Sequence, residues 1–133
     1  MIRTDLYIDR YDWDIRALFD VEARDLPYVS QCLREVHATP DILARVREII
    51  RPDNYNYGIT RSCATCRKTL IVIGRTTSIG ELINSIAHEI RHLVDDIASV
   101  NGMALKGEEV GYLTGFVADK LTKGIKDRVC SCK

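Results

Sequence analysis

Leu70-Ile71-Val72-Ile73-Gly74-Arg75-Thr76-Thr77-Ser78 is the stretch that decides the fold, because it joins a strand to a helix. Its apolar run is too short for a typical helix and rich in β-branched residues, so we predict a buried strand within residues 68–77. Ser78 is a residue type that caps helices, and Glu81, three positions on, completes a capping box. We therefore predict a helix from Ser78 to about Val100 that ends at Asn101-Gly102, a usual C-terminal signal.

The segments on either side of this unit alternate between strand and helix patterns. Apolar residues recur at every second position within residues 6–21, which predicts at least one half-buried strand. The spacing becomes helical over residues 26–51, where Thr39-Pro40-Asp41 divides two helices, and a short strand is predicted at 58–62. A last helix is predicted from Leu105 to Leu121. Together these elements indicate an α+β fold with a short β-sheet packed on helices, in a single domain over residues 1–133.

Composition excludes several classes of protein. The chain has 133 residues, 46% of them hydrophobic and 29% charged, which is ordinary for a globular domain. Its 19 basic residues balance its 19 acidic residues, so we expect no nucleic-acid partner. No apolar stretch approaches the roughly 20 residues that span a bilayer, and the first residues do not resemble a signal peptide. We expect no membrane partner and a cytoplasmic location, where the five cysteines would be reduced thiols.

The helix predicted from Ser78 carries the motif His88-Glu89-Ile90-Arg91-His92. Residues four apart on an α-helix differ by about 40° in direction and about 6 Å in height, so His88 and His92 can offer ring nitrogens to one metal ion. Glu89 lies next to them, where its carboxylate can reach a water bound to that ion. This pattern is typical of zinc-dependent hydrolysis, provided that the context is helical.

A helical wheel places the two histidines on the polar side of this helix. The apolar stripe lies nearly opposite and should face the core; it consists of Ile83, Ile86, Ile90, Leu93, Val94 and Ile97. The polar side consists of Glu81, Ser85, His88, His92, Asp95 and Asp96. An ordinary solvated helix face would give the same wheel, so the wheel alone does not distinguish an active site from a surface.

The last predicted helix supplies candidates for a third ligand, because catalytic zinc usually takes three protein ligands and keeps one position for water. Glu108 and Glu109 follow His92 at a separation that allows a turn and a returning helix. Glu108 shares its helix side with Gly111 and Gly115, which would let this side approach the histidine helix closely. We therefore expect Glu108 to be the ligand and Glu109 to be the alternative. Acidic residues also favour helix N-termini without any metal.

The pattern of His88, Glu89 and His92 followed by Glu108 resembles the gluzincin arrangement of thermolysin-like metallopeptidases. Gly111 matches the small residue that this pattern tends to place after the glutamate, whereas Tyr112 stands where an aspartate often occurs. Residues 70–113 also resemble small metallopeptidases encoded in phages and prophages. The resemblance implies a zincin-like domain that holds Zn²⁺ and cleaves a peptide or protein substrate.

In that family scheme Glu89 is the general base, and the resemblance implies that Tyr112 or Arg91 stabilises the oxyanion. Asp95 and Asp96 could orient the histidines. A substrate strand would pair with a sheet edge near the histidine helix, for which residues 68–75 are the expected strand.

The cysteines allow a second metal site, because Cys63, Cys66, Cys130 and Cys132 could supply four thiolates. Cys32 is expected to be a buried helix residue. Three functions remain open from the sequence. The chain is an active zinc peptidase, a metal-binding module without strong activity that serves in phage assembly or host interaction, or a structural protein whose histidines bind nothing. The sequence leaves the oligomeric state undetermined.

Overall fold

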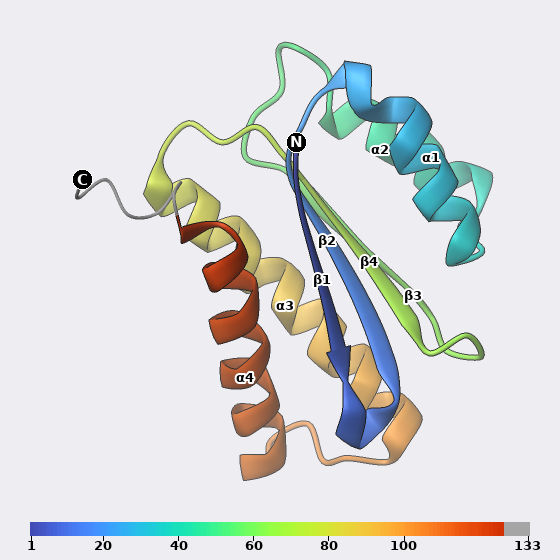
Figure 1. The fold of residues 1–133 in the computed structure, drawn as a ribbon, viewed down its shortest axis with the longest axis vertical. Helices are drawn as coiled ribbons and strands as arrows, with labels where there is room; N and C mark the ends of the chain where they lie inside the picture. The colour runs from blue at the N-terminus through green and yellow to red at the C-terminus, as the bar shows by residue number, and fades with distance from the viewer. Residues whose placement is uncertain (127–133) are drawn as a thin grey trace.

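The computed structural model describes residues 1–126, which form a four-stranded mixed sheet covered by helices on both faces (Figure 1). In spatial order the strands are β1 (Ile2–Ile8), β2 (Trp13–Val21), β4 (Lys68–Gly74) and β3 (Gly58–Cys63). β1 pairs with β2 and β3 with β4 in antiparallel fashion, whereas β2 and β4 are parallel. The longer helices are α1 (Leu26–Glu35), α2 (Pro40–Ile49), α3 (Ile79–Asn101) and α4 (Glu108–Gly124). The expectation of an α+β fold is confirmed.

The central strand β4 explains why its sequence is apolar without alternation. Leu70 and Val72 belong to the core beneath α1 and α2, and Ile71 and Ile73 belong to the core beneath α3 and α4. A strand buried on both faces reads as a continuous hydrophobic run. This position also corrects one expectation: residues 68–75 do not supply a sheet edge, because β4 lies between β2 and β3.

The helix α3 begins and ends as its sequence predicts. The Ser78 side chain accepts a hydrogen bond from the Glu81 backbone nitrogen at 3.1 Å, and Gly102 adopts the left-handed conformation with φ 66°. Its buried face is rotated from the predicted stripe, because Ile83 is 51% exposed while Ser85 and Glu89 are buried. The cause is the neighbour on each side: α3 contacts α4 along one flank and β3 along the other. The burial therefore extends toward β3.

The helices α3 and α4 cover the same face of the sheet but lie toward opposite edges of it. α4 contacts β1 in addition to α3, whereas α3 contacts β3 and β4. α4 starts at Glu108, three residues later than predicted from Leu105. Among residues 1–126, no helix is both long and apolar enough to cross a bilayer.

Candidate functional site

His88 and His92 lie on the exposed flank of α3 that faces the edge strand β3. Their Nε2 atoms are 3.2 Å apart, and the two rings meet edge to face with centroids 4.9 Å apart. Two adjoining hollows open here, one lined by His88 and the other by both histidines. Gly58 of β3 and Arg45 of α2 line both hollows. The structure thus brings the two motif histidines together in a depression between a helix and a sheet edge.

Glu89 is buried between α3 and β3, where its carboxylate accepts a hydrogen bond from β3. Its side chain is only 3% exposed, and its Oε2 accepts a 2.6 Å hydrogen bond from Thr60 Oγ1. Gly58 leaves room for this carboxylate, because a Cβ atom there would lie 3.2 Å from both Cγ and Oε1 of Glu89. Glu89 also lines both hollows beside the histidines. A carboxylate fixed in this way is available to a group bound in the hollow without reorganisation.

Asp96 completes the polar wall of the hollow that contains His92. Its Oδ2 accepts a 2.6 Å hydrogen bond from Ser62 Oγ. Ser62 Oγ lies 2.8 Å from Thr69 Oγ1, which in turn accepts a 2.8 Å hydrogen bond from the buried Trp13 indole. Asp96 is therefore anchored through the sheet to the core, and it accepts its hydrogen bond from a serine rather than from a histidine.

The structure does not bring the expected third ligand to the histidines. Glu109 Oε1 accepts hydrogen bonds from Tyr11 at 2.8 Å and from Arg10 at 3.0 Å, at the turn between β1 and β2. Glu108 begins α4, and α3 continues past His92 to Asn101 before the chain reaches it. The nine residues of α3 that follow His92 extend about 13 Å along the helix axis, so the chain leaves α3 at that distance from His92. Glu108 and Glu109 are the first two residues of α4, which packs against the flank of α3 that faces away from β3.

The face of α4 that carries Gly111 and Gly115, which led us to expect Glu108 as the ligand, does not pack against α3. A Cβ atom built at Gly111 or Gly115 would meet nothing within 4 Å, so these glycines do not let α4 approach α3 more closely. Tyr112 is 75% exposed on α4 and is not among the residues that line the histidine hollows. Arg91 pairs instead with Asp95 at 3.1 Å.

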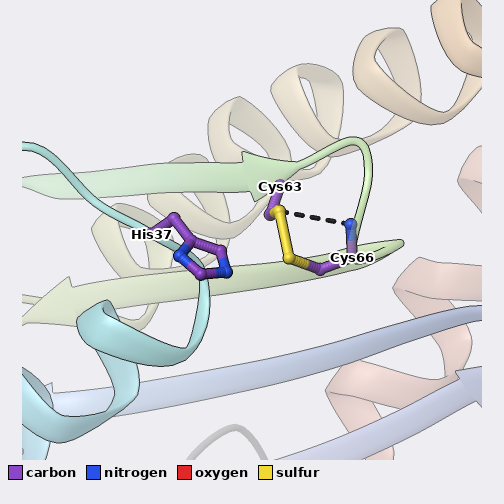
Figure 2. Close-up of side chains that lie close together, drawn as sticks. All are labelled: His37, Cys63 and Cys66. Atoms are coloured by element: carbon purple, nitrogen blue, oxygen red, sulfur yellow. Dashed lines mark hydrogen bonds between the residues drawn. A yellow bond between two sulfur atoms is a disulfide. The ribbon is translucent and has the colours of Figure 1, made fainter.

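A different group of metal-ligand side chains is assembled at the other end of β3. One ring nitrogen of His37 and the Sγ atoms of Cys63 and Cys66 lie within 4.8 Å of one another, and within residues 1–126 this is the one group of three or more such residues found (Figure 2). These three residues could hold a metal ion. His37 was not predicted as a ligand, because it precedes Cys63 by 26 positions and matches no ligand spacing. The only available signal was that it is the one histidine of the chain's three that lies outside the His88–His92 motif.

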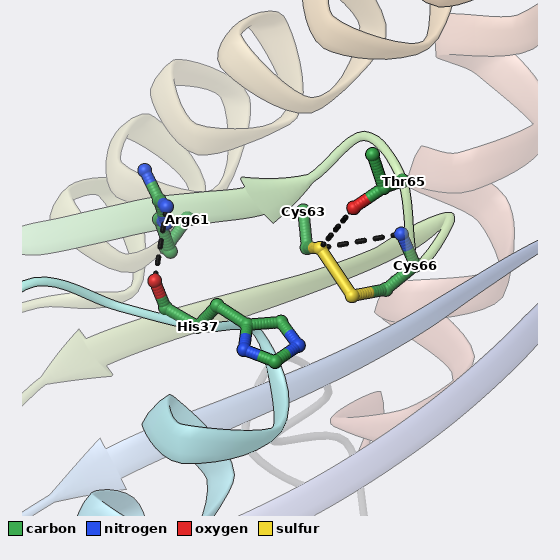
Figure 3. The surroundings of a disulfide bond; sticks show 5 residues. All are labelled: His37, Arg61, Cys63, Thr65 and Cys66. Atoms are coloured by element: carbon green, nitrogen blue, oxygen red, sulfur yellow. Dashed lines mark hydrogen bonds between the residues drawn. A yellow bond between two sulfur atoms is a disulfide. The ribbon is translucent and has the colours of Figure 1, made fainter.

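The cysteines differ in part from their expected state. Cys63 and Cys66 form a disulfide, contrary to the expectation of reduced thiols (Figure 3). The turn between β3 and β4 brings their Cα atoms to 5.2 Å, within the range that a disulfide spans. Cys32 is a free, buried cysteine on α1, as expected. Cys130 and Cys132 lie outside the described residues.

Comparisons of the chain with protein-family models, with curated proteins and with solved structures give no match.

Proposed function

We propose that the chain is a zinc-dependent hydrolase that cleaves peptide bonds, with His88 and His92 holding the ion and Glu89 acting as the general base. The observation that carries the proposal is the 3.2 Å separation of the two Nε2 atoms. Two nitrogens bound at about 2.0–2.1 Å to a tetrahedral zinc ion are about 3.3–3.4 Å apart. The side chains thus fit a shared zinc ion with little adjustment.

The surroundings of Glu89 support its role. Zinc, when bound, polarises a substrate carbonyl and makes a bound water a nucleophile at neutral pH. The Glu89 carboxylate would take the proton of that water and deliver it to the leaving amine. Thr60 fixes one carboxylate oxygen by its 2.6 Å hydrogen bond, which orients the group without occupying Oε1.

The edge strand β3 supports a peptide as the substrate. Within residues 1–126, β3 pairs only with β4, so its outer edge presents backbone donors and acceptors beside the hollow of the histidines. An extended peptide can add to such an edge as a further strand. Gly58 and Thr60 lie on this strand, so a peptide bound along it would pass close to Glu89.

A third ligand is needed for a catalytic zinc ion. Asp96 lines the same hollow as His92, whereas Glu108 would have to be brought from the other flank of α3. In the described residues neither carboxylate lies within 4.8 Å of both histidine nitrogens, but Asp96 lines the hollow and needs the smaller movement. The experiment compares zinc binding by Asp96→Asn and Glu108→Gln, and we expect the larger loss in Asp96→Asn.

The test begins with metal analysis of protein purified without chelator and without reductant, so that the Cys63–Cys66 disulfide stays closed. We expect about one zinc per chain. The ion should be lost in a variant with both His88→Gln and His92→Gln, and retained in the matched control His37→Gln. Zinc absent from the parent protein, or unchanged in the double variant, would refute the metal site.

Hydrolysis is tested separately with fluorescein-labelled casein. We expect cleavage by the parent protein and its abolition in Glu89→Gln, with zinc content unchanged because Glu89 is not a ligand. If the zinc-loaded parent protein does not cleave casein or a library of short peptides, the second candidate function holds, namely a metal-binding module without peptidase activity. The preformed pair of histidine nitrogens favours that alternative over a purely structural role.

A further inference from the structure

Two separate parts of the fold converge on the group His37, Cys63 and Cys66 (Figure 2). Cys63 ends β3 and Cys66 lies in the turn that leads to β4, so both come from one hairpin. His37 comes from the connection between α1 and α2, which covers the opposite face of the sheet from α3. This group is therefore separate from the histidine hollow.

The His37 backbone is fixed at this position. Its φ of 52° lies in the left-handed region, which is uncommon for residues other than glycine. Its nitrogen donates to the Arg34 carbonyl at 3.1 Å, and its carbonyl accepts a 3.1 Å hydrogen bond from Arg61 of β3 (Figure 3). The turn is thereby held against the hairpin, and the imidazole is exposed beside the sulfur atoms.

The surroundings of Cys63 suit a negatively charged sulfur. The Cys66 backbone nitrogen donates to Cys63 Sγ at 3.2 Å, and Thr65 Oγ1 lies 3.4 Å from the same sulfur (Figure 3). Neutral sulfur is a weak acceptor, whereas a thiolate gains from each donor directed at it. Arg61 holds the turn of His37 through its carbonyl oxygen, and its Nε is buried without a hydrogen-bond partner among the described residues.

We propose that His37, Cys63 and Cys66 form a second metal site, which binds a zinc ion when the disulfide is reduced. Two thiolates and an imidazole are the donors that structural zinc prefers, with a fourth position left for water or a further ligand. The ion would connect the α1–α2 connection to the β3–β4 hairpin.

Replacement of the disulfide by a metal ion requires a two-electron reductant, which an external dithiol supplies. The S–S bond accepts two electrons and two protons from the dithiol, which becomes a disulfide. Zinc then binds the two sulfurs, and their two protons pass to solvent. The disulfide and the metal site exclude each other, so metal binding requires reducing conditions.

The test uses the full chain with His88→Gln, His92→Gln, Cys130→Ser and Cys132→Ser, which removes the other candidate ligands and makes the outcome independent of the proposed hydrolase site. Co²⁺ is titrated into protein reduced with a phosphine, because Co²⁺ bound to thiolates gives a sulfur-to-metal charge-transfer band. We expect one Co²⁺ per chain in the reduced protein, displacement of the band by added Zn²⁺, and no band in the oxidised protein.

Two variants assign the ligands. His37→Gln should weaken Co²⁺ binding at least tenfold while circular dichroism shows the fold retained, and Cys66→Ser should abolish the charge-transfer band. Thr122→Val, an exposed change on α4, serves as a control with unchanged binding. A reduced protein with no charge-transfer band would overturn the proposal and leave a redox disulfide, and an unchanged affinity in His37→Gln would overturn the role of His37.

Discussion

Thr60→Val should destabilise the protein, because it removes the one side-chain donor that the structure gives to the buried Glu89 carboxylate. Valine keeps the shape of threonine and suits β3, so the change isolates the hydroxyl group. A hydrogen bond to a charged group contributes about 1.5–3 kcal/mol, and a buried group left without its partner loses a similar amount. We expect a loss of about 2 kcal/mol in the free energy of unfolding.

Equilibrium unfolding in urea, followed by circular dichroism, measures this loss. For a chain of this length, each kcal/mol corresponds to roughly 3–5 °C in Tm, so thermal scans should show a decrease of about 6–10 °C. Thr114→Val is the matched control: its hydroxyl donates only to the Val110 carbonyl within α4, and Thr114 is exposed. That variant should change stability by less than about 0.5 kcal/mol.

A double-mutant cycle with Glu89→Ala tests whether the Thr60 hydroxyl acts through the Glu89 carboxylate. If the hydroxyl acts through the Glu89 carboxylate, Thr60→Val should cost little once that carboxylate is gone, which gives a coupling energy of about 2 kcal/mol. A coupling energy below about 0.5 kcal/mol would refute the account. It would mean that the Thr60 hydroxyl acts through its other partner, the Glu89 backbone carbonyl 3.2 Å away, which Glu89→Ala retains.

Three further predictions concern the other side of the molecule. Gly124→Ala should cost about 1–3 kcal/mol, because a Cβ atom there would collide with Thr4 of β1, and Thr4→Ala in the same chain should recover part of the loss in urea unfolding. Glu109→Gln should weaken the hydrogen bond from the Tyr11 hydroxyl and lower Tm by a few degrees, while zinc content measured by metal analysis stays unchanged. Partial burial acts to raise the pKa of Asp5, but hydrogen bonds from two arginines outweigh it and hold the pKa below 3.8, so Asp5 stabilises the fold above that pH. The stability difference between the parent protein and Asp5→Asn should therefore be largest near neutral pH and vanish as the pH falls through the folded pKa, and equal differences at pH 7 and pH 2 would contradict this.

Local patterns predicted the elements of the fold well, because their causes are local. The cap at Ser78 and the left-handed Gly102 define α3, and the apolar run of β4 follows from burial on both faces. The direction of the buried face of α3 was less predictable, because β3 and α4 share its flanks. Ile83 is therefore exposed and Glu89 buried, which no helical wheel of α3 alone can predict.

Only the part of the candidate site that lies within the single helix α3 could be predicted from the sequence. His88 and His92 meet because four residues of α-helix separate them. Glu108 depends instead on the order of strands in the sheet, which places α4 beside β1 and the histidines beside β3. His37 depends on a left-handed turn between two helices, and no spacing in the sequence encodes that approach.

The hydrogen bonds that run from Asp96 through Ser62 and Thr69 to Trp13 give the protein a built-in optical probe. Trp13 is the only tryptophan of the chain, and its side chain is fully buried. Its indole N–H donates to the threonine that also contacts Ser62, so a change at Asp96 alters the polarity around the indole. Intrinsic fluorescence can therefore follow occupancy of the hollow beside His92 in the unlabelled protein.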